Sequence, residues 1–215
     1  MEKVYLNGEE YPIDKEKFTT LNQLLQHIQK QLEEKKETII EVRVDELNHT
    51  LDFSDEDNDI SLDYIDKIEI LSENLDNLTI EILDHIEEYL KNIENSLNNL
   101  SENFLNQDKL LEAYSQLQDL IEGIKQINEA FTSMTNFNYI DLNKKLTTGM
   151  STLEYLSNIA SQFNKLSDAF NEKNIEEVSR IIKEDLKQRL KEFKEILPEI
   201  KEEIKNKINI SNKGE

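Results

Sequence analysis

The sequence has no cysteine, and it has only four glycines and two prolines among its 215 residues. Without cysteine, the chain can form no disulfide, no thiolate metal site and no cysteine nucleophile. The few glycines form neither a Gly-x-Gly-x-x-Gly fingerprint nor a P-loop, and the Gly-x-Ser-x-Gly motif of serine hydrolases is absent as well. We therefore predict a non-enzymatic protein that uses no cofactor.

Long hydrophobic runs are also missing. No stretch approaches the roughly 18 apolar residues that a membrane-spanning helix requires. The segment Met1–Gly8 contains no run long enough for the core of a signal peptide. From these two features we expect a soluble, cytoplasmic protein with no membrane partner.

Basic residues are scarce: 25 lysines and arginines are outnumbered by 46 aspartates and glutamates, which gives a net charge of −21. Residues 1–75 have a net charge of −12 and residues 76–170 one of −9, whereas residues 171–215 are balanced. Such a surface repels nucleic-acid phosphates and anionic lipids, which proteins bind through lysine and arginine. We expect no nucleic-acid partner, and a basic or neutral protein is the expected partner.

The most informative feature that is present is a change of hydrophobic period near Ser72. Upstream of it, apolar residues alternate every second position around one helical segment, whereas residues 75–209 repeat them every three or four positions. The pattern predicts an α+β protein. We expect a small domain at 1–74, a helical domain at 75–209 and a frayed tail at 210–215.

The first domain is expected to begin with a hairpin and a helix. Val4–Leu6 and Glu9–Ile13 flank Asn7-Gly8, a pair that favours the type I′ turn of a two-residue hairpin. Thr20–Gln23 fits a capping box, which opens a helix that we expect to end near Lys36.

Two further strands are expected, at 38–44 and 67–71, because apolar and polar residues alternate there. In the first of them, Ile40, Val42 and Val44 are expected on one face. The element order of the domain is therefore ββαβ…β.

This order, closed by Tyr64-Ile65-Asp66-Lys67-Ile68-Glu69-Ile70, resembles the β-grasp fold of ubiquitin-like and sulfur-carrier proteins. The resemblance covers residues 1–72. Conjugated members of these families end in Gly-Gly, whereas here the strand runs into Ser72-Glu73-Asn74-Leu75 and continues as helix. The resemblance therefore implies a compact module used for protein contacts, without the conjugation chemistry.

The second domain contains four blocks of apolar residues with helical spacing, at 75–104, 110–131, 146–170 and 175–197. Short connections favour a mostly antiparallel four-helix bundle. Gly123 and Gly149 lie within the second and third blocks, where close helix approach is the expected reason for glycine. Pro198 predicts a kink or break in the last helix, followed by a short helix at Glu199–Ile208.

The nearest approach to a metal site is an acidic loop. When the loop is numbered from Asp55, its aspartates match positions 1, 3, 5, 9 and 12 of a calcium-binding loop. These residues are Asp55, Asp57, Asp59, Asp63 and Asp66. Ile60 stands where that loop needs glycine, and its last ligand is aspartate instead of glutamate. A solvated acidic loop is favoured over a cation site or a metal-dependent hydrolase.

A second candidate site is the polar connection Thr132–Tyr139, which contains Met134, Phe137 and Tyr139. These three side chains either pack under the end of the bundle or form a contact with a partner protein. We predict a non-enzymatic interaction module, an adaptor or a chaperone-like binder of a protein client. The alternatives are a structural homo-oligomer built on the long helices and a divalent-metal-binding protein that uses the loop at 55–66.

Overall fold

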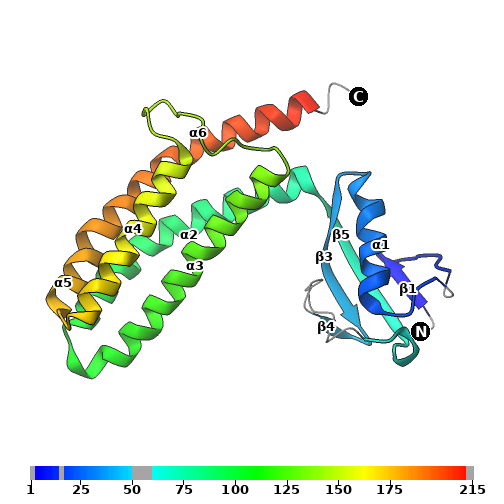
Figure 1. Ribbon diagram of the computed structural model, residues 1–215, viewed down its shortest axis with the longest axis horizontal. Helices are drawn as coiled ribbons and strands as arrows, with labels where there is room; N and C mark the ends of the chain where they lie inside the picture. The colour runs from blue at the N-terminus through cyan, green and yellow to red at the C-terminus, as the bar shows by residue number, and fades with distance from the viewer. Residues whose placement is uncertain (1–2, 15–16, 50–59, 212–215) are drawn as a thin grey trace. The chain divides into compact units, whose positions relative to one another are not determined.

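The computed structural model describes residues 3–14, 17–49 and 60–211. The chain divides into two compact units between Thr79 and Ile80 (Figure 1). The N-terminal unit contains a small mixed β-sheet, and the C-terminal unit is helical. The predicted α+β class is therefore confirmed.

The sheet of the N-terminal unit has five strands in the order β2-β1-β5-β3-β4. Strands β1 and β5 pair in parallel, and the other neighbours are antiparallel. The elements are β1 (Lys3–Leu6), β2 (Glu9–Glu10), α1 (Leu21–Glu33), β3 (Glu37–Val44), β4 (Leu47–His49), η2 (Leu62–Tyr64) and β5 (Lys67–Asn74).

The predicted hairpin is present, but its second strand is short. Asn7 and Gly8 both have positive φ, 52° and 83°, as a type I′ turn requires. Strand β2 ends at Glu10, so the expected strand up to Ile13 is wrong. Pro12 lacks the N–H that would continue the ladder, which accounts for the early end.

Helix α1 packs on the sheet with one apolar face, which holds the buried residues Leu21, Leu24, Leu25, Ile28 and Leu32. The Thr20 hydroxyl accepts a hydrogen bond from the Gln23 N–H at 3.5 Å. The Gln23 side chain in turn accepts from the Thr19 N–H at 3.0 Å, one residue before the position a capping box uses. The helix ends at Glu33, and Lys36 with φ of 55° lies in the turn to β3.

The face expected for Ile40 is wrong. Ile39 and Val42 are buried, whereas Ile40 is exposed. The pairing of β3 with β5 shifts between Ile39 and Glu41, which is a β-bulge. A bulge inserts one unpaired residue, so the residues before and after it exchange faces.

Strand β5 passes directly into the first long helix, α2 (Leu75–Phe104). The Asn74 side chain accepts hydrogen bonds from the N–H groups of Asp76 at 2.9 Å and Asn77 at 3.2 Å. It thereby satisfies two of the unpaired donors at the start of the helix.

The C-terminal unit is built from helices that share one hydrophobic core. They are the greater part of α2, followed by η3 (Gln107–Lys109), α3 (Leu110–Asn136), α4 (Thr152–Asn171), α5 (Ile175–Arg180), the π-helical turn η4 (Ile181–Leu186) and α6 (Lys187–Ser211). Helices α2, α3, α4 and the continuous stretch from α5 to α6 each contribute buried residues to this core.

The third helix begins later than its hydrophobic pattern indicates. Helix α4 starts at Thr152, so Leu146 and Gly149 lie in the preceding loop. Leu146 is nevertheless buried, which explains why it extends the apolar pattern. Gly149 has φ of 85°, a conformation that favours glycine, so its predicted role in close helix approach is wrong.

The last helix is not broken at Pro198. Helix α6 continues through the proline to Ser211, so the separate helix predicted at Glu199–Ile208 is wrong. Burial of Leu197, Ile200 and Ile204 in the core holds the helix together on both sides of the lost hydrogen bond.

The departure from regular geometry lies upstream, at η4. Buried residues follow one another at steps of four, namely Val178, Ile182, Leu186 and Leu190. In a helix of 3.6 residues per turn, three such steps drift by about 120° around the axis. A π-turn has more residues per turn and removes this drift, so the four side chains stay on one stripe.

The start of α4 is fixed by a complete capping box with an added lysine. Ser151 and Glu154 bond each other's backbone N–H groups, and Lys145 Nζ lies 2.5 Å from Glu154 Oε2. The hydrogen bond from Lys145, followed by those from Ser151, lowers the pKa of Glu154 from 4.5 to about 2. A carboxyl with a lowered pKa stabilises the folded state above its unfolded pKa and loses this effect as the pH falls.

We expect the free energy of unfolding of the Glu154→Gln variant to decrease less than that of the wild-type protein as the pH falls below 4.5. The wild-type protein loses the contribution of Glu154 between pH 4.5 and about 2, whereas glutamine retains the acceptor and does not titrate. The free energy of unfolding from urea titrations across this range measures the difference. An identical pH dependence in wild type and variant would contradict the assignment.

Candidate interaction surface

The acidic loop proposed from the sequence is only partly within the described residues. Asp55, Asp57 and Asp59 lie outside them. Asp63 lies in η2, where its N–H donates to the Ser61 hydroxyl at 3.4 Å, and the Asp66 N–H donates to Asp45 Oδ1 at 3.1 Å. Within residues 3–14, 17–49 and 60–211, no group of three or more histidine, aspartate or glutamate side chains is placed to hold a metal ion.

The connection that contains Met134, Phe137 and Tyr139 is mostly helical. Helix α3 extends to Asn136, so the expected polar link begins later than predicted. Met134 is 3% exposed and belongs to the core, and Tyr139 packs against the same core. Phe137 is 51% exposed, so of the three it alone has the exposure that a partner contact needs.

Helix α3 carries two apolar stripes. The first is buried in the core and consists of Ala113, Leu117, Leu120, Ile124, Ile127, Phe131 and Met134. The second, which we call the outer stripe, consists of Leu111, Tyr114 and Ile121, which are 87%, 47% and 46% exposed. Spacings of three and seven place its members on one side of the helix.

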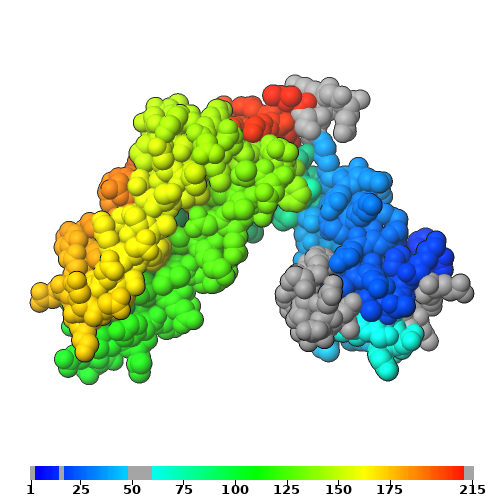
Figure 2. Space-filling view, in the orientation of Figure 1, coloured from blue at the N-terminus to red at the C-terminus, as the bar shows by residue number. Residues whose placement is uncertain are grey.

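The outer stripe borders an open groove between α3 and α4, here called the α3–α4 groove. Its volume is about 450 Å³, and it is lined by Tyr114, Leu117, Gln118, Ile121, Glu122, Phe163, Leu166, Ser167, Phe170 and Asn171. Figure 2 shows the two helices side by side on the face toward the viewer, α3 in green and α4 in yellow. The groove has a mainly apolar floor, and Glu122 is the only charged residue in its lining.

An aromatic cluster closes one end of this groove. The rings of Phe104, Tyr114 and Phe170 lie 5.5 to 5.7 Å apart between centroids, and Phe104 meets both of the others edge to face. Each such ring pair stabilises the folded state by about 0.5–1.5 kcal/mol, in addition to the contribution from burying its apolar area. Tyr114 is therefore a positioned side chain although nearly half of it is exposed.

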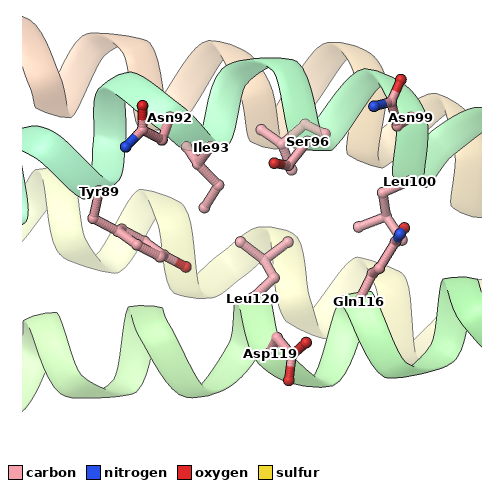
Figure 3. Close-up of a pocket in the computed structure, with 10 residues that line it drawn as sticks. Tyr89, Asn92, Ile93, Ser96, Asn99, Leu100, Gln116, Asp119 and Leu120 are labelled. Carbon is pink, nitrogen blue, oxygen red and sulfur yellow. The ribbon is translucent and has the colours of Figure 1, made fainter.

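A second groove, of about 290 Å³, lies between α2 and α3 (Figure 3). Tyr89 projects from α2 toward α3, and Leu120 and Gln116 project from α3 toward α2. Burial, with a smaller effect of the Asp119 charge, raises the pKa of the Tyr89 hydroxyl, so the phenol stays neutral. Among its lining residues, Asp119 is the only charged one.

Gly123 of α3 faces the side chain of Tyr89 from α2. A Cβ atom at this position would overlap the hydroxyl end of Tyr89. Gly123 therefore leaves room for the phenol of Tyr89, and close approach of the two helix backbones stays a prediction.

The charges along α3 are mostly negative. The helix contains Glu112, Asp119, Glu122 and Glu129, with Lys125 as its single basic residue. Lys125 lies 3.9 Å from Glu122 and 3.7 Å from Glu129, and all three side chains are exposed. Helix α3 therefore has a net charge of −3.

The apolar pattern of the second block, residues 110–131, includes Tyr114 and Ile121, and the structure leaves both nearly half exposed. The signal for an outer stripe was an excess of apolar residues. Seven of the residues from Leu110 to Ile124 are leucine, isoleucine or tyrosine, more than one helix face can bury.

We expect Gly123→Ala to be less favourable in the wild-type protein than in a Tyr89→Ala background. In the wild-type protein, the new methyl group must displace the hydroxyl end of Tyr89, and this cost offsets part or all of the roughly 1 kcal/mol that alanine gains over glycine in a helix. In a Tyr89→Ala background that clash is gone, and alanine stabilises the helix by about 1 kcal/mol relative to glycine. Urea unfolding of the four proteins measures the coupling. Equal changes in both backgrounds would contradict the contact.

The two units match two different family profiles. Residues 3–74 are similar to the TP0873 N-terminal domain, and residues 81–196 match the family described as Domain of unknown function (DUF8042). The two matched segments lie on either side of the division between Thr79 and Ile80. No match was found among curated proteins or among solved structures. Because the second profile covers more than half of the 215 residues, the chain belongs to the DUF8042 family.

Proposed function

We propose that this protein is a non-enzymatic interaction module, and that its helical unit binds a basic, amphipathic helix of a protein partner in the α3–α4 groove. The observation that carries the proposal is the outer stripe of α3, which is apolar, regularly spaced and exposed. An apolar groove between two helices is a recurring receptor for the apolar face of a third.

The groove offers suitable anchor positions. Tyr114 and Ile121 are seven residues apart, about two helical turns, and each exposes nearly half of its side chain. When a bound helix covers the exposed half of one of these side chains, the burial contributes on the order of 1 kcal/mol to the binding free energy. Tyrosine is among the residues that contribute most to binding at protein interfaces.

The charge of α3 favours a different protein as the occupant over a second copy of this chain. A two-fold dimer through α3 would place the same patch on both partners, so its acidic residues would lie opposite acidic residues. A basic helix would place its positive charges opposite the acidic residues of α3, and this attraction would increase the rate of association between the two proteins. A homo-oligomer built on this helix is therefore the less favoured alternative.

We further propose that the N-terminal unit has the β-grasp fold and that the C-terminal unit is a mostly antiparallel four-helix bundle. The strand order β2-β1-β5-β3-β4, with parallel β1 and β5 in the middle and α1 packed on the sheet, supports the first assignment. The single core shared by α2, α3, α4 and the stretch from α5 to α6 supports the second.

Within the described parts of the chain, no helix is both long and apolar enough to cross a membrane. Exposed Phe137, just beyond α3, is a further contact that a partner could use. An adaptor or a chaperone-like binder would use such surfaces without any chemical step. The proposal therefore needs a test that identifies the partner and then measures its binding to this groove.

The test begins with a photo-crosslinking amino acid placed at Tyr114 in the full chain, in the cells that produce it. The same substitution at Leu153, an exposed residue of α4 that does not line the groove, is the matched control. We expect a partner that is crosslinked from position 114 and not from position 153. Capture of the same proteins from both positions would contradict the proposal.

The captured segment is then synthesised, and its affinity for the purified chain is measured by calorimetry. Ile121→Asp, which buries a charge in the groove, is expected to raise the Kd about tenfold or more. Leu153→Asp lies in the first turn of α4, where an acidic residue is tolerated, and is expected to leave the Kd unchanged. The proposal would be overturned if the captured segment is acidic, or if its Kd is the same for the wild-type protein and the Ile121→Asp variant.

A further inference from the structure

The groove between α2 and α3, here called the α2–α3 groove, combines an apolar floor with polar side chains around it. Its volume of about 290 Å³ is just below the range of about 300–1,000 Å³ that is typical of sites for drug-sized ligands, so it suits a smaller molecule. It shares no lining residue with the α3–α4 groove. A ligand bound here is therefore independent of the proposed function.

The floor of this groove is formed by buried aliphatic side chains from both helices. Figure 3 shows Ile93 and Leu100 of α2 and Leu120 of α3 in the space between the two ribbons. Each of these residues is at most 7% exposed, as is Leu97, which also lines the groove. Because covering apolar surface is favourable, the floor favours a ligand with an apolar body.

Polar side chains with unused hydrogen-bonding groups surround the floor. Gln116 is already occupied, because it donates to Glu112 at 3.0 Å and accepts from Asn103 at 3.3 Å. Within residues 3–14, 17–49 and 60–211, the side chains of the other polar lining residues form no hydrogen bond or ion pair, and these residues are Tyr89, Asn92, Ser96, Asn99 and Asp119. A ligand can therefore bond to them without first breaking a hydrogen bond within the protein.

Tyr89 is the most firmly positioned of these polar groups. Its partly buried side chain projects from α2 toward α3, where Gly123 leaves room for the hydroxyl end of the ring. The raised pKa of the phenol keeps this hydroxyl neutral. A neutral hydroxyl offers its oxygen as an acceptor as well as one proton as a donor.

Asp119 lies close to the same hydroxyl. It precedes Gly123 by four residues on α3, so the two positions share one side of the helix, with about 5–6 Å between neighbouring Cβ positions. Since the hydroxyl end of Tyr89 occupies the Cβ position of Gly123, the carboxylate of Asp119 is about one helical turn away from it. The contribution of the Asp119 charge to the raised pKa of Tyr89 agrees with this placement.

The charge of the lining selects the sign of the ligand. Asp119 is negative and exposed, and no lysine, arginine or histidine is among the described residues that line the groove. A carboxylate or a phosphate would therefore meet no opposite charge here. A protonated amine would meet an opposite charge, and its N–H groups can donate to more than one acceptor at once.

We propose that the α2–α3 groove binds a small organic amine in its protonated form, as a free molecule. The ammonium group donates to the carboxylate of Asp119 and to the hydroxyl oxygen of Tyr89. The first of these is a charge-assisted hydrogen bond with opposite charges, which is stronger than a neutral one. The apolar body of the amine covers the floor of the groove. No covalent bond is made or broken, so the protein binds the amine without changing it.

The first test is calorimetry of the full chain with two amines that differ in their apolar bodies, hexylamine and 2-phenylethylamine. Each amine is compared with the alcohol of the same skeleton, 1-hexanol or 2-phenylethanol, which lacks the charge. We expect at least one amine to bind with a Kd about tenfold or more below that of its alcohol. The proposal would be overturned if neither amine binds, or if an alcohol binds as tightly as its amine.

A further ligand distinguishes a free amine from a lysine of a partner protein. Nα-acetyl-lysine N-methylamide carries the same ammonium group on a segment of peptide backbone. We expect it to bind more weakly than the amine that binds best, because its peptide groups would lose hydrogen bonds to water over the apolar floor. Equal or tighter binding would assign the groove to a protein side chain and would overturn a free amine as its ligand.

The second test separates binding in the groove from a general attraction to the net charge of −21. Asp119→Asn is expected to raise the Kd of the amine about tenfold or more. Asp168→Asn removes the same charge at an exposed position of α4 outside the groove, so we expect it to leave the Kd unchanged. Both residues are exposed, and circular dichroism checks that both variants fold. The same Kd in the two variants would overturn the proposal.

The third test removes the hydroxyl of Tyr89 and leaves its ring in place. Tyr89→Phe is expected to raise the Kd of the amine about threefold or more, because one acceptor of the ammonium group is lost. Tyr64→Phe, at a residue of the N-terminal unit that is 85% exposed, is the matched control and is expected to leave the Kd unchanged. If Tyr89→Phe binds the amine as tightly as the wild-type protein does, the proposed site is wrong.

Discussion

The helical unit depends on one constraint, namely that every helix must bury a stripe of apolar side chains in the same core. Where the sequence spaces that stripe at steps of four, from Val178 to Leu190, an α-helix would carry it away from the core. The π-turn η4 keeps the stripe buried. The cost of an irregular turn is offset by the burial of Ile182 and Leu186, both fully enclosed.

The same constraint explains the apolar surface that we propose to be functional. The core accepts only one face of α3, so the outer stripe remains at the surface beside α4. The π-turn places Glu184 and Asp185 against α4, where Gln162 is buried. Helix α4 therefore separates an apolar groove from a polar, charged surface.

Sequence reasoning succeeded where local signals agreed with each other. The Asn7-Gly8 turn, the buried face of α1 and the direct passage of β5 into helix all follow from short patterns. It failed where tertiary context prevailed. A bulge between Ile39 and Glu41 changes which residues of β3 face the core. Gly149 lies in the loop before α4. Helix α6 continues past Pro198 because the residues on both sides of it are buried.

By itself, the sequence determined the α+β class, the acidic character and the absence of cysteine chemistry, because composition and hydrophobic period are local properties. Only the tertiary structure decided which apolar residues of α3 stay exposed and which polar side chains line the α2–α3 groove. Those outcomes depend on what other helices bring to the same place. A periodic pattern specifies a face, but the neighbouring helices determine whether that face is covered.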